Sequence, residues 1–153
     1  MAALKKRYYP KIAEEVYLAT LDNGMSLSII KKKGFIEKAA FLSTNFGALD
    51  NRFYIDGKLQ TYPAGIAHFL EHKLFEDDQG RDVTLDFVKL GADVNAFTTL
   101  DRTTYYFSTI DHFEESLELL LKFTSEFTSS EDTVNHEKRI IETNHTTRLC
   151  WTL

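Results

Sequence analysis

The sequence has 153 residues, of which 43% are hydrophobic, and this is enough for one domain with a hydrophobic core. Its formal net charge of -5 argues against general binding to nucleic acid, which attracts basic surfaces. No apolar stretch approaches the roughly 20 residues of a membrane helix, and the single cysteine, Cys150, excludes an internal disulfide and a cysteine zinc site. We therefore expect a soluble, cytoplasmic protein without a signal peptide, in which histidine and carboxylate groups bind any metal.

The first part of the chain has the pattern of β-strands. Val16–Leu21 and Ser26–Lys31 are short β-rich segments on either side of Asp22-Asn23-Gly24, which is typical of a hairpin turn. Lys38–Phe46 predicts a third strand. The segment that follows, as far as Pro63, has the composition of turns.

Two helices are predicted next. Ala64–Phe75 carries apolar residues at helical spacing, with Pro63 near its start: Ile66, Phe69, Leu70 and Leu74. Asp82–Leu90 predicts a second helix, with Asp82 as its N-cap and Gly91 where helices often stop.

The rest of the chain predicts two strands and then helices. Asp93–Leu100 and Thr103–Ile110 are separated by Asp101 and Arg102, which favours an antiparallel pair. Helical spacing returns in His112–Phe127, which places on one side of a helix Phe113, Leu117, Leu120, Leu121 and Phe127, and again around Val134, Ile140 and Ile141. We expect an α+β fold, a mostly antiparallel sheet with helices on one face, over residues 1–142, with an irregular tail at 143–153.

The helix at Ala64–Phe75 contains the sequence HFLEH. His68 and His72 are four residues apart, so on a helix their imidazoles share one face and can converge on one ion. Glu71 projects near the same edge and can take a proton from a water that the ion activates. HxxEH is the inverted form of the HExxH peptidase signature. The alternative is a core helix with polar flanks that happens to carry two histidines.

The surroundings of this motif resemble the pitrilysin/insulinase family of zinc metallopeptidases. The likeness rests on GIAHFLEHKLFE, GADVNAFTTLDRTTYYFST, NGMSLSI, NFGALDNRF and EKRII. Within that family, the chain is most similar to bacterial relatives of the mitochondrial processing peptidases, from about Tyr17 to Ile141. The resemblance implies that His68 and His72 bind Zn²⁺, that Glu71 activates water and that Glu137 assists. It also implies that Asn95 and Ala96 lie on the strand that binds an extended peptide.

The third zinc ligand of that family does not match. The family has a glutamate seven residues after the assisting one, and this chain has Asn144 there, which is a poor zinc ligand. Glu142 and His145 are the weak substitutes. Because the likeness stops near Glu142, we expect a truncation or an altered reading frame there. The family also implies a second homologous lobe or subunit as partner.

Three functions remain open at this point. The first is zinc-dependent hydrolysis of peptide bonds in peptides or unfolded segments, of which this chain would supply a part. The second is a non-catalytic, peptide-binding or subunit-type relative that lacks a complete metal site. The third is a fragment without activity of its own.

Overall fold

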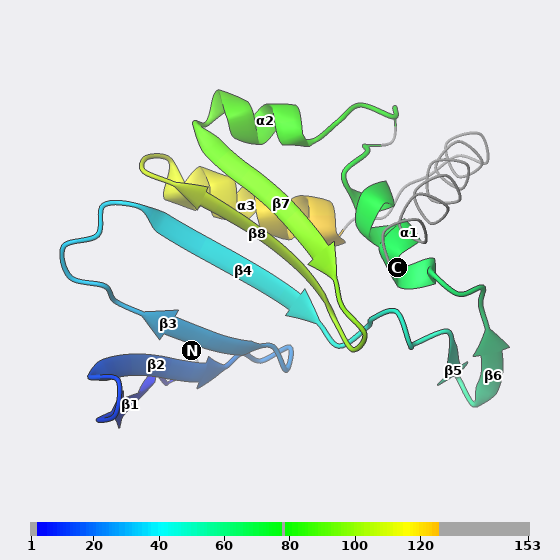
Figure 1. The fold of residues 1–153 in the computed structure, drawn as a ribbon, viewed down its shortest axis with the longest axis horizontal. Coiled ribbons are helices and arrows are strands. Elements are labelled where there is room, and N and C mark those ends of the chain that lie inside the picture. Colours follow the sequence, from blue (N-terminus) through cyan, green and yellow to red (C-terminus); the bar gives the residue numbers. More distant parts are fainter. Residues whose placement is uncertain (1–2, 78, 126–153) are drawn as a thin grey trace, which may run out of the picture. The chain divides into compact units, whose positions relative to one another are not determined.

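The structure is a computed structural model that describes residues 3–77 and 79–125 (Figure 1). The chain separates into two compact units, residues 1–36 and 37–153, which are described one at a time. The helix predicted around Val134, Ile140 and Ile141 and the tail at 143–153 lie outside the described residues.

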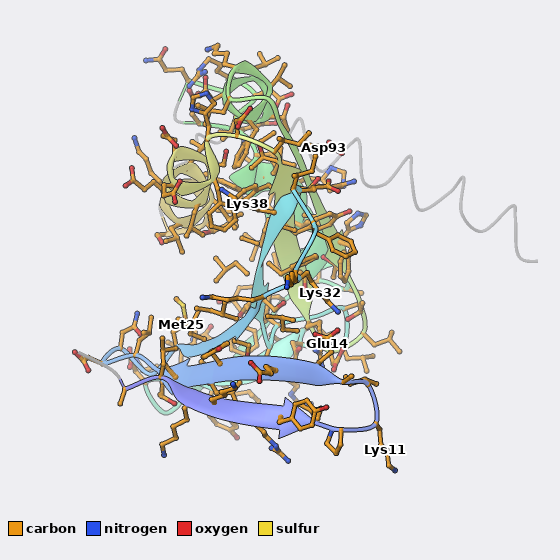
Figure 2. The ribbon with its side chains drawn as sticks, turned by 90° about the vertical axis from the view of Figure 1, so that its left-hand side faces the viewer. Lys11, Glu14, Met25, Lys32, Lys38 and Asp93 are labelled. Carbon is orange, nitrogen blue, oxygen red and sulfur yellow. The ribbon has the colours of Figure 1, made fainter. Side chains whose placement is uncertain are left out.

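The first unit is a three-stranded antiparallel sheet in the order β1-β2-β3. Its strands are β1 (Lys5–Tyr9), β2 (Glu14–Thr20) and β3 (Ser26–Ile30). The predicted hairpin is confirmed: Leu21 N–H donates to the Met25 carbonyl at 2.8 Å, and Gly24 has a φ of 86°. Glu14 and Lys32, both labelled in Figure 2, form an ion pair in this unit.

A three-stranded antiparallel sheet also forms the centre of the second unit. Its strands are β4 (Lys38–Thr44), β7 (Ala92–Thr98) and β8 (Thr103–Thr109), in the order β4-β8-β7. The helices are α1 (Ile66–Leu74), α2 (Thr84–Lys89) and α3 (Phe113–Ser125). The edge-on view in Figure 2 shows that α3 covers one face of the sheet. The expected α+β class is thus confirmed.

The core of this unit lies between the sheet and its helices. Alternate residues of β8, Tyr105 and Phe107, point inward, because successive side chains of a strand face opposite sides of a sheet. They meet Phe87 of α2 and, from α3, Leu120 and Phe123. Leu121, on the apolar side that the spacing predicts for this helix, is 39% exposed.

The segment predicted as turns before Pro63 contains a hairpin, which corrects the prediction. Its strands are β5 (Arg52–Ile55) and β6 (Lys58–Thr61). Asp56 and Gly57 connect them with φ values of 49° and 74°. Two successive positive φ angles are those of a type I′ turn, for which Asp-Gly is a preferred sequence.

The helix α2 begins slightly later than predicted. Its N-cap position is Val83 rather than Asp82, although the Asp82 carboxylate still accepts the Thr84 N–H at 2.8 Å. Gly91 ends the helix as predicted, with a φ of 70° that glycine adopts without steric cost. Of the helices described in Figure 1, none is long and apolar enough to cross a membrane.

Candidate metal centre

The candidate metal centre lies on α1, which begins with an unusual backbone. Gly65 precedes the helix with a φ of 88°, and its carbonyl accepts the first helical bond, from Phe69 N–H at 2.9 Å. A left-handed residue at this position is costly for any side chain but glycine. Gly65 therefore fixes where the helix starts. Because residues four apart lie on the same face of a helix, His68 and His72 then share one face of α1.

His68 and His72 lie together on α1, as their spacing predicts. Their Nε2 atoms are 3.0 Å apart and their ring centroids 4.7 Å apart, with the rings nearly perpendicular. Both side chains are half-buried. The prediction that two imidazoles one turn apart converge is confirmed.

The histidine pair fits a zinc ion. With Zn–N distances of about 2.0–2.1 Å and tetrahedral angles, two ligand nitrogens lie roughly 3.3–3.4 Å apart. The Nε2 atoms are within a few tenths of an ångström of that separation. Imidazole is also a preferred ligand for zinc. The two imidazole nitrogens are thus held in nearly the geometry that two of the usual three protein ligands of zinc require.

Glu71 lies beside the pair and is buried, with 8% of its surface exposed. One carboxylate oxygen of Glu71 and one ring nitrogen of each histidine all lie within 4.8 Å of one another. The Glu71 carboxylate is therefore close enough to act on a molecule bound next to the two histidines. Burial raises the pKa of the Tyr105 phenol, and the nearby charge of Glu71 raises it further.

Two threonines that the sequence analysis missed complete the surroundings of Glu71. The Thr98 hydroxyl donates to Oε2 of Glu71. Its oxygen lies 3.2 Å from the hydroxyl oxygen of Thr103, which in turn donates to the Phe46 carbonyl at 2.8 Å. Thr98 stands in the NAFT segment, but no sequence pattern links it to a helix 27 residues earlier.

Strand β7 carries Asn95 and Ala96, the residues assigned to peptide binding. Among the described strands it pairs with β8 alone, so it is an edge of the described sheet. At the turn, Thr99 N–H donates to the carbonyl of Arg102, its opposite residue, at 2.8 Å. Because bonded and unbonded pairs alternate along an antiparallel ladder, the backbone polar groups of Asn95 and Phe97 face β8.

The backbone groups at the intervening positions point the other way. By the same alternation, the N–H and C=O of Val94, Ala96 and Thr98 face away from β8, toward the open edge. The Ala96 N–H donates there to Oδ1 of Asn95 at 2.8 Å, and the Asn95 side chain is exposed. The side chain of Asn95 thus occupies the Ala96 N–H, a backbone donor with which an added strand could pair.

The other sequence-predicted site residues lie outside the described part of the chain. These are Glu137, which is expected to assist, the expected ligand position Asn144, and the substitutes Glu142 and His145. His112 is exposed and contacts Glu115 at 3.4 Å.

Comparison of the sequence with known proteins gives consistent matches. The model of the family described as Insulinase (Peptidase family M16) matches residues 60–147. A Bacillus subtilis (strain 168) protein called uncharacterized zinc protease YmfH is 44% identical over 140 residues, 90% of this chain and 32% of that protein. The insulin-degrading enzyme homolog of Dictyostelium discoideum is 31% identical over 130 residues, 82% of this chain and 13% of that protein.

Solved structures agree with these matches. A crystal structure described as that of an M16-like peptidase from Alicyclobacillus acidocaldarius has a TM-score of 0.80 at 36% identity, covering 86% of this chain and 31% of that one. Pitrilysin has a TM-score of 0.72 at 18% identity, covering 97% and 16%, and this likeness shows the fold alone. The chain thus spans about a third of the length of two of these relatives, 32% of YmfH and 31% of the Alicyclobacillus protein.

Proposed function

The chain belongs to the insulinase family, peptidase family M16, and from this premise we propose that it supplies the catalytic part of a zinc-dependent peptidase. The observation that carries the proposal is the Nε2–Nε2 distance of 3.0 Å between His68 and His72, with the Glu71 carboxylate beside them. The name of the relative YmfH, a zinc protease, supports the metal.

His68 and His72 would hold the zinc ion through Nε2. When bound, the ion would act as a Lewis acid that polarises a carbonyl and lowers the pKa of water to about 7. Glu71 would take the proton of the attacking water and pass it to the leaving amine. Its burial suits this role, because bulk water is kept from the carboxylate.

The substrate would be an extended peptide added to the edge strand β7. The outward N–H and C=O groups of Val94, Ala96 and Thr98 offer the main-chain bonds that strand addition requires. Asn95 would release the Ala96 N–H to the peptide and use its own amide on the substrate. Thr98 lies on the same strand and contacts Glu71, so the edge and the base are adjacent.

The remaining parts of the enzyme are proposed from the family resemblance. Glu137 would support the site, and a second homologous lobe or subunit would close on the peptide. The share of the relatives that this chain spans, 32% for YmfH, supports the need for further parts.

The first experiment separates metal binding from hydrolysis. We expect the purified protein to contain zinc, to cleave a fluorogenic peptide, and to lose cleavage on chelation and regain it with added Zn²⁺. Glu71→Gln should keep zinc and lose at least about 100-fold in kcat, since general acid-base catalysis contributes 10²–10⁴-fold. His72→Ala should lose zinc itself.

The matched controls carry the same substitutions at exposed positions of α3 and its start. Glu118→Gln and His112→Ala should keep both zinc and activity. Equal cleavage rates for the wild type and Glu71→Gln would reject the hydrolase function of this chain.

The second candidate function is a non-catalytic, peptide-binding subunit. Asn144, at the position of the third zinc ligand, favours it. A protein that contains no zinc under metal-replete conditions but still binds an extended peptide would support this function over hydrolysis.

A further inference from the structure

The catalytic carboxylate has a hydrogen-bond donor from another element. Glu71 is on α1, and the hydroxyl of Thr98, the last residue of β7, donates to its Oε2. A carboxylate side chain has three rotatable bonds, and a bond to a fixed strand restricts them. The position of Glu71 therefore depends on β7 as well as on its own helix.

Thr98 is itself held in place. Its β-branched side chain has few rotamers, and its oxygen lies 3.2 Å from that of Thr103. Thr103 is 2% exposed and donates its one hydrogen to the Phe46 carbonyl at 2.8 Å. The single hydrogen of Thr98 is thereby directed to Glu71, and the pair of threonines connects the carboxylate to the segment that follows β4.

The backbone of Thr98 has a second role. Its N–H and C=O face the open edge of β7, where the proposed peptide would pair. One residue thus bears both a main-chain contact for the substrate and a side-chain contact for the base. A peptide bond placed by the strand would lie at a fixed offset from the carboxylate.

We infer that Thr98 is a positioning residue, which orients the Glu71 carboxylate relative to the substrate strand and leaves Oε1 as the oxygen that accepts the proton of water. The inference rests on the proposed hydrolytic function. It assigns no role to Thr98 in binding zinc, because both histidines lie on α1 and Thr98 lies on β7.

The test compares three variants of the zinc-loaded protein. Thr98→Val keeps the shape and removes the hydroxyl, and Thr98→Ser keeps the hydroxyl. The control Thr104→Val makes the same change on the neighbouring strand β8. The Thr104 hydroxyl contacts the hydroxyl of Ser43 at 2.8 Å rather than Glu71. Thr104 is buried, with 4% of its surface exposed, whereas Thr98 is half-buried, so the control removes a threonine hydroxyl from a more enclosed position of the same sheet.

We expect Thr98→Val to lose roughly 10- to 100-fold in kcat, since misplacement of a catalytic group by about 1 Å can cost 10²-fold. KM and zinc content should stay within about twofold, because neither the edge backbone nor the histidines change. Thr98→Ser should restore most of kcat, and Thr104→Val should keep it. A kcat unchanged in Thr98→Val, or lost equally in Thr98→Ser, overturns the inference.

A readout that does not need turnover keeps the inference separate from the proposed function. Crystal structures of the zinc-loaded wild type and Thr98→Val should show the Glu71 carboxylate displaced in the variant while His68 and His72 stay in place. An unmoved carboxylate overturns the positioning role even if the protein is inactive. By contrast, an inactive wild type with a displaced Glu71 in the variant rejects the hydrolase function and keeps the role of Thr98.

Discussion

Gly47 lies against the turn that joins β7 to β8, and no other residue fits there. A Cβ atom at this position would be 2.4 Å from the backbone nitrogen of Arg102 and 2.6 Å from backbone atoms of Asp101. The contact is fixed, because Ala48 N–H donates to the Thr99 carbonyl at 2.9 Å. The close approach holds the segment after β4 against the strands that position Thr98 and Thr103.

Gly47→Ala should therefore be strongly destabilising. Backbone atoms cannot move aside as a flexible side chain can, so we expect a loss of about 3 kcal/mol or more in the free energy of unfolding, at the high end for overpacking. Gly57→Ala is the control, since nothing lies within 4 Å and only its φ of 74° is strained. That strain costs about 1–2 kcal/mol. Urea unfolding of both variants measures which one loses more free energy of unfolding, and equal losses would contradict the prediction.

The sequence predicted part of the site at this scale and could not predict the rest. The i, i+3 and i+4 spacing of His68, Glu71 and His72 is a local property of a helix, so their meeting could be predicted. The bond from Thr98 to Glu71 depends on how β7 docks on α1, which no local pattern contains. The roles of the site residues stay predictions: His68 and His72 in binding metal, Glu71 and Glu137 in catalysis, and Asn95 and Ala96 in binding substrate.

The loop before α2 and the helix itself are joined by ion pairs around Arg81. Its guanidinium contacts the carboxylates of Asp77 and Asp86 at 3.0 and 2.9 Å, and Lys89 also contacts Asp86 at 2.8 Å. The hydrogen bond from Arg81, followed by that from Lys89, lowers the pKa of Asp86 to about 2. Asp86 is thus better stabilised as an anion in the folded protein than in the unfolded chain.

The stability that Asp86 contributes should depend on pH. A lowered folded-state pKa means that this contribution is present above the ordinary value of 3.8 and is lost as the pH falls through about 2. Asp86→Asn should cost up to about 1 kcal/mol at pH 7, because largely exposed pairs contribute little. The difference from wild type should vanish near pH 2.

Denaturant unfolding at several pH values measures this dependence. Asp93→Asn is the control, because none of the ion pairs recorded for residues 3–77 and 79–125 involves Asp93. A cost for Asp86→Asn that stays constant from pH 7 to pH 2 would contradict the role of the ion pairs.

Most elements could be predicted from local patterns, and the failures have identifiable causes. The hairpin at Asp22-Asn23-Gly24 and the stop at Gly91 follow from turn chemistry. The sequence did not predict β1, because three of its five residues, Lys5, Lys6 and Arg7, are charged and do not have the apolar pattern of a strand. The β5–β6 hairpin is indicated in the sequence by Asp56-Gly57, but the composition of the whole segment predicts turns without strands.

The core of the second unit connects its three described helices to the sheet. Phe87 and Phe107 are fully buried, and Leu74 and Phe75, at the end of the metal helix, pack against the same cluster. The stability of the helix that carries His68 and His72 therefore depends on residues far from it in sequence.

Phe87→Ala should destabilise this unit by about 3–5 kcal/mol, the range for removing a buried phenylalanine ring. Zinc binding should weaken along with folding, since α1 loses part of its support. Val88→Ala, at the next residue of α2, is the control, because Val88 is 68% exposed. Thermal unfolding with and without Zn²⁺ measures both effects, and a Phe87→Ala protein as stable as the control would contradict the core assignment.

The fold class could be predicted from the order of the elements, but the topology of the sheet could not. Sequence proximity predicted the β7–β8 pair. It did not predict that β8 lies between β7 and β4, with Phe41 opposite Tyr106. Nor did it predict two compact units, because no proline- or glycine-rich linker marks residue 36.

The alternation of backbone groups along β7 has a consequence for how the products of cleavage are spaced. Val94, Ala96 and Thr98 present their amides outward, while the residues between them are engaged with β8. If the proposed peptidase cuts one bound peptide more than once, a peptide that slides along this ladder without turning about its axis re-forms its bonds after moving by two residues, about 6.6–6.8 Å. Successive cuts of one bound peptide of uniform sequence should then give fragments that differ in length by even numbers of residues, which mass spectra of the digest measure.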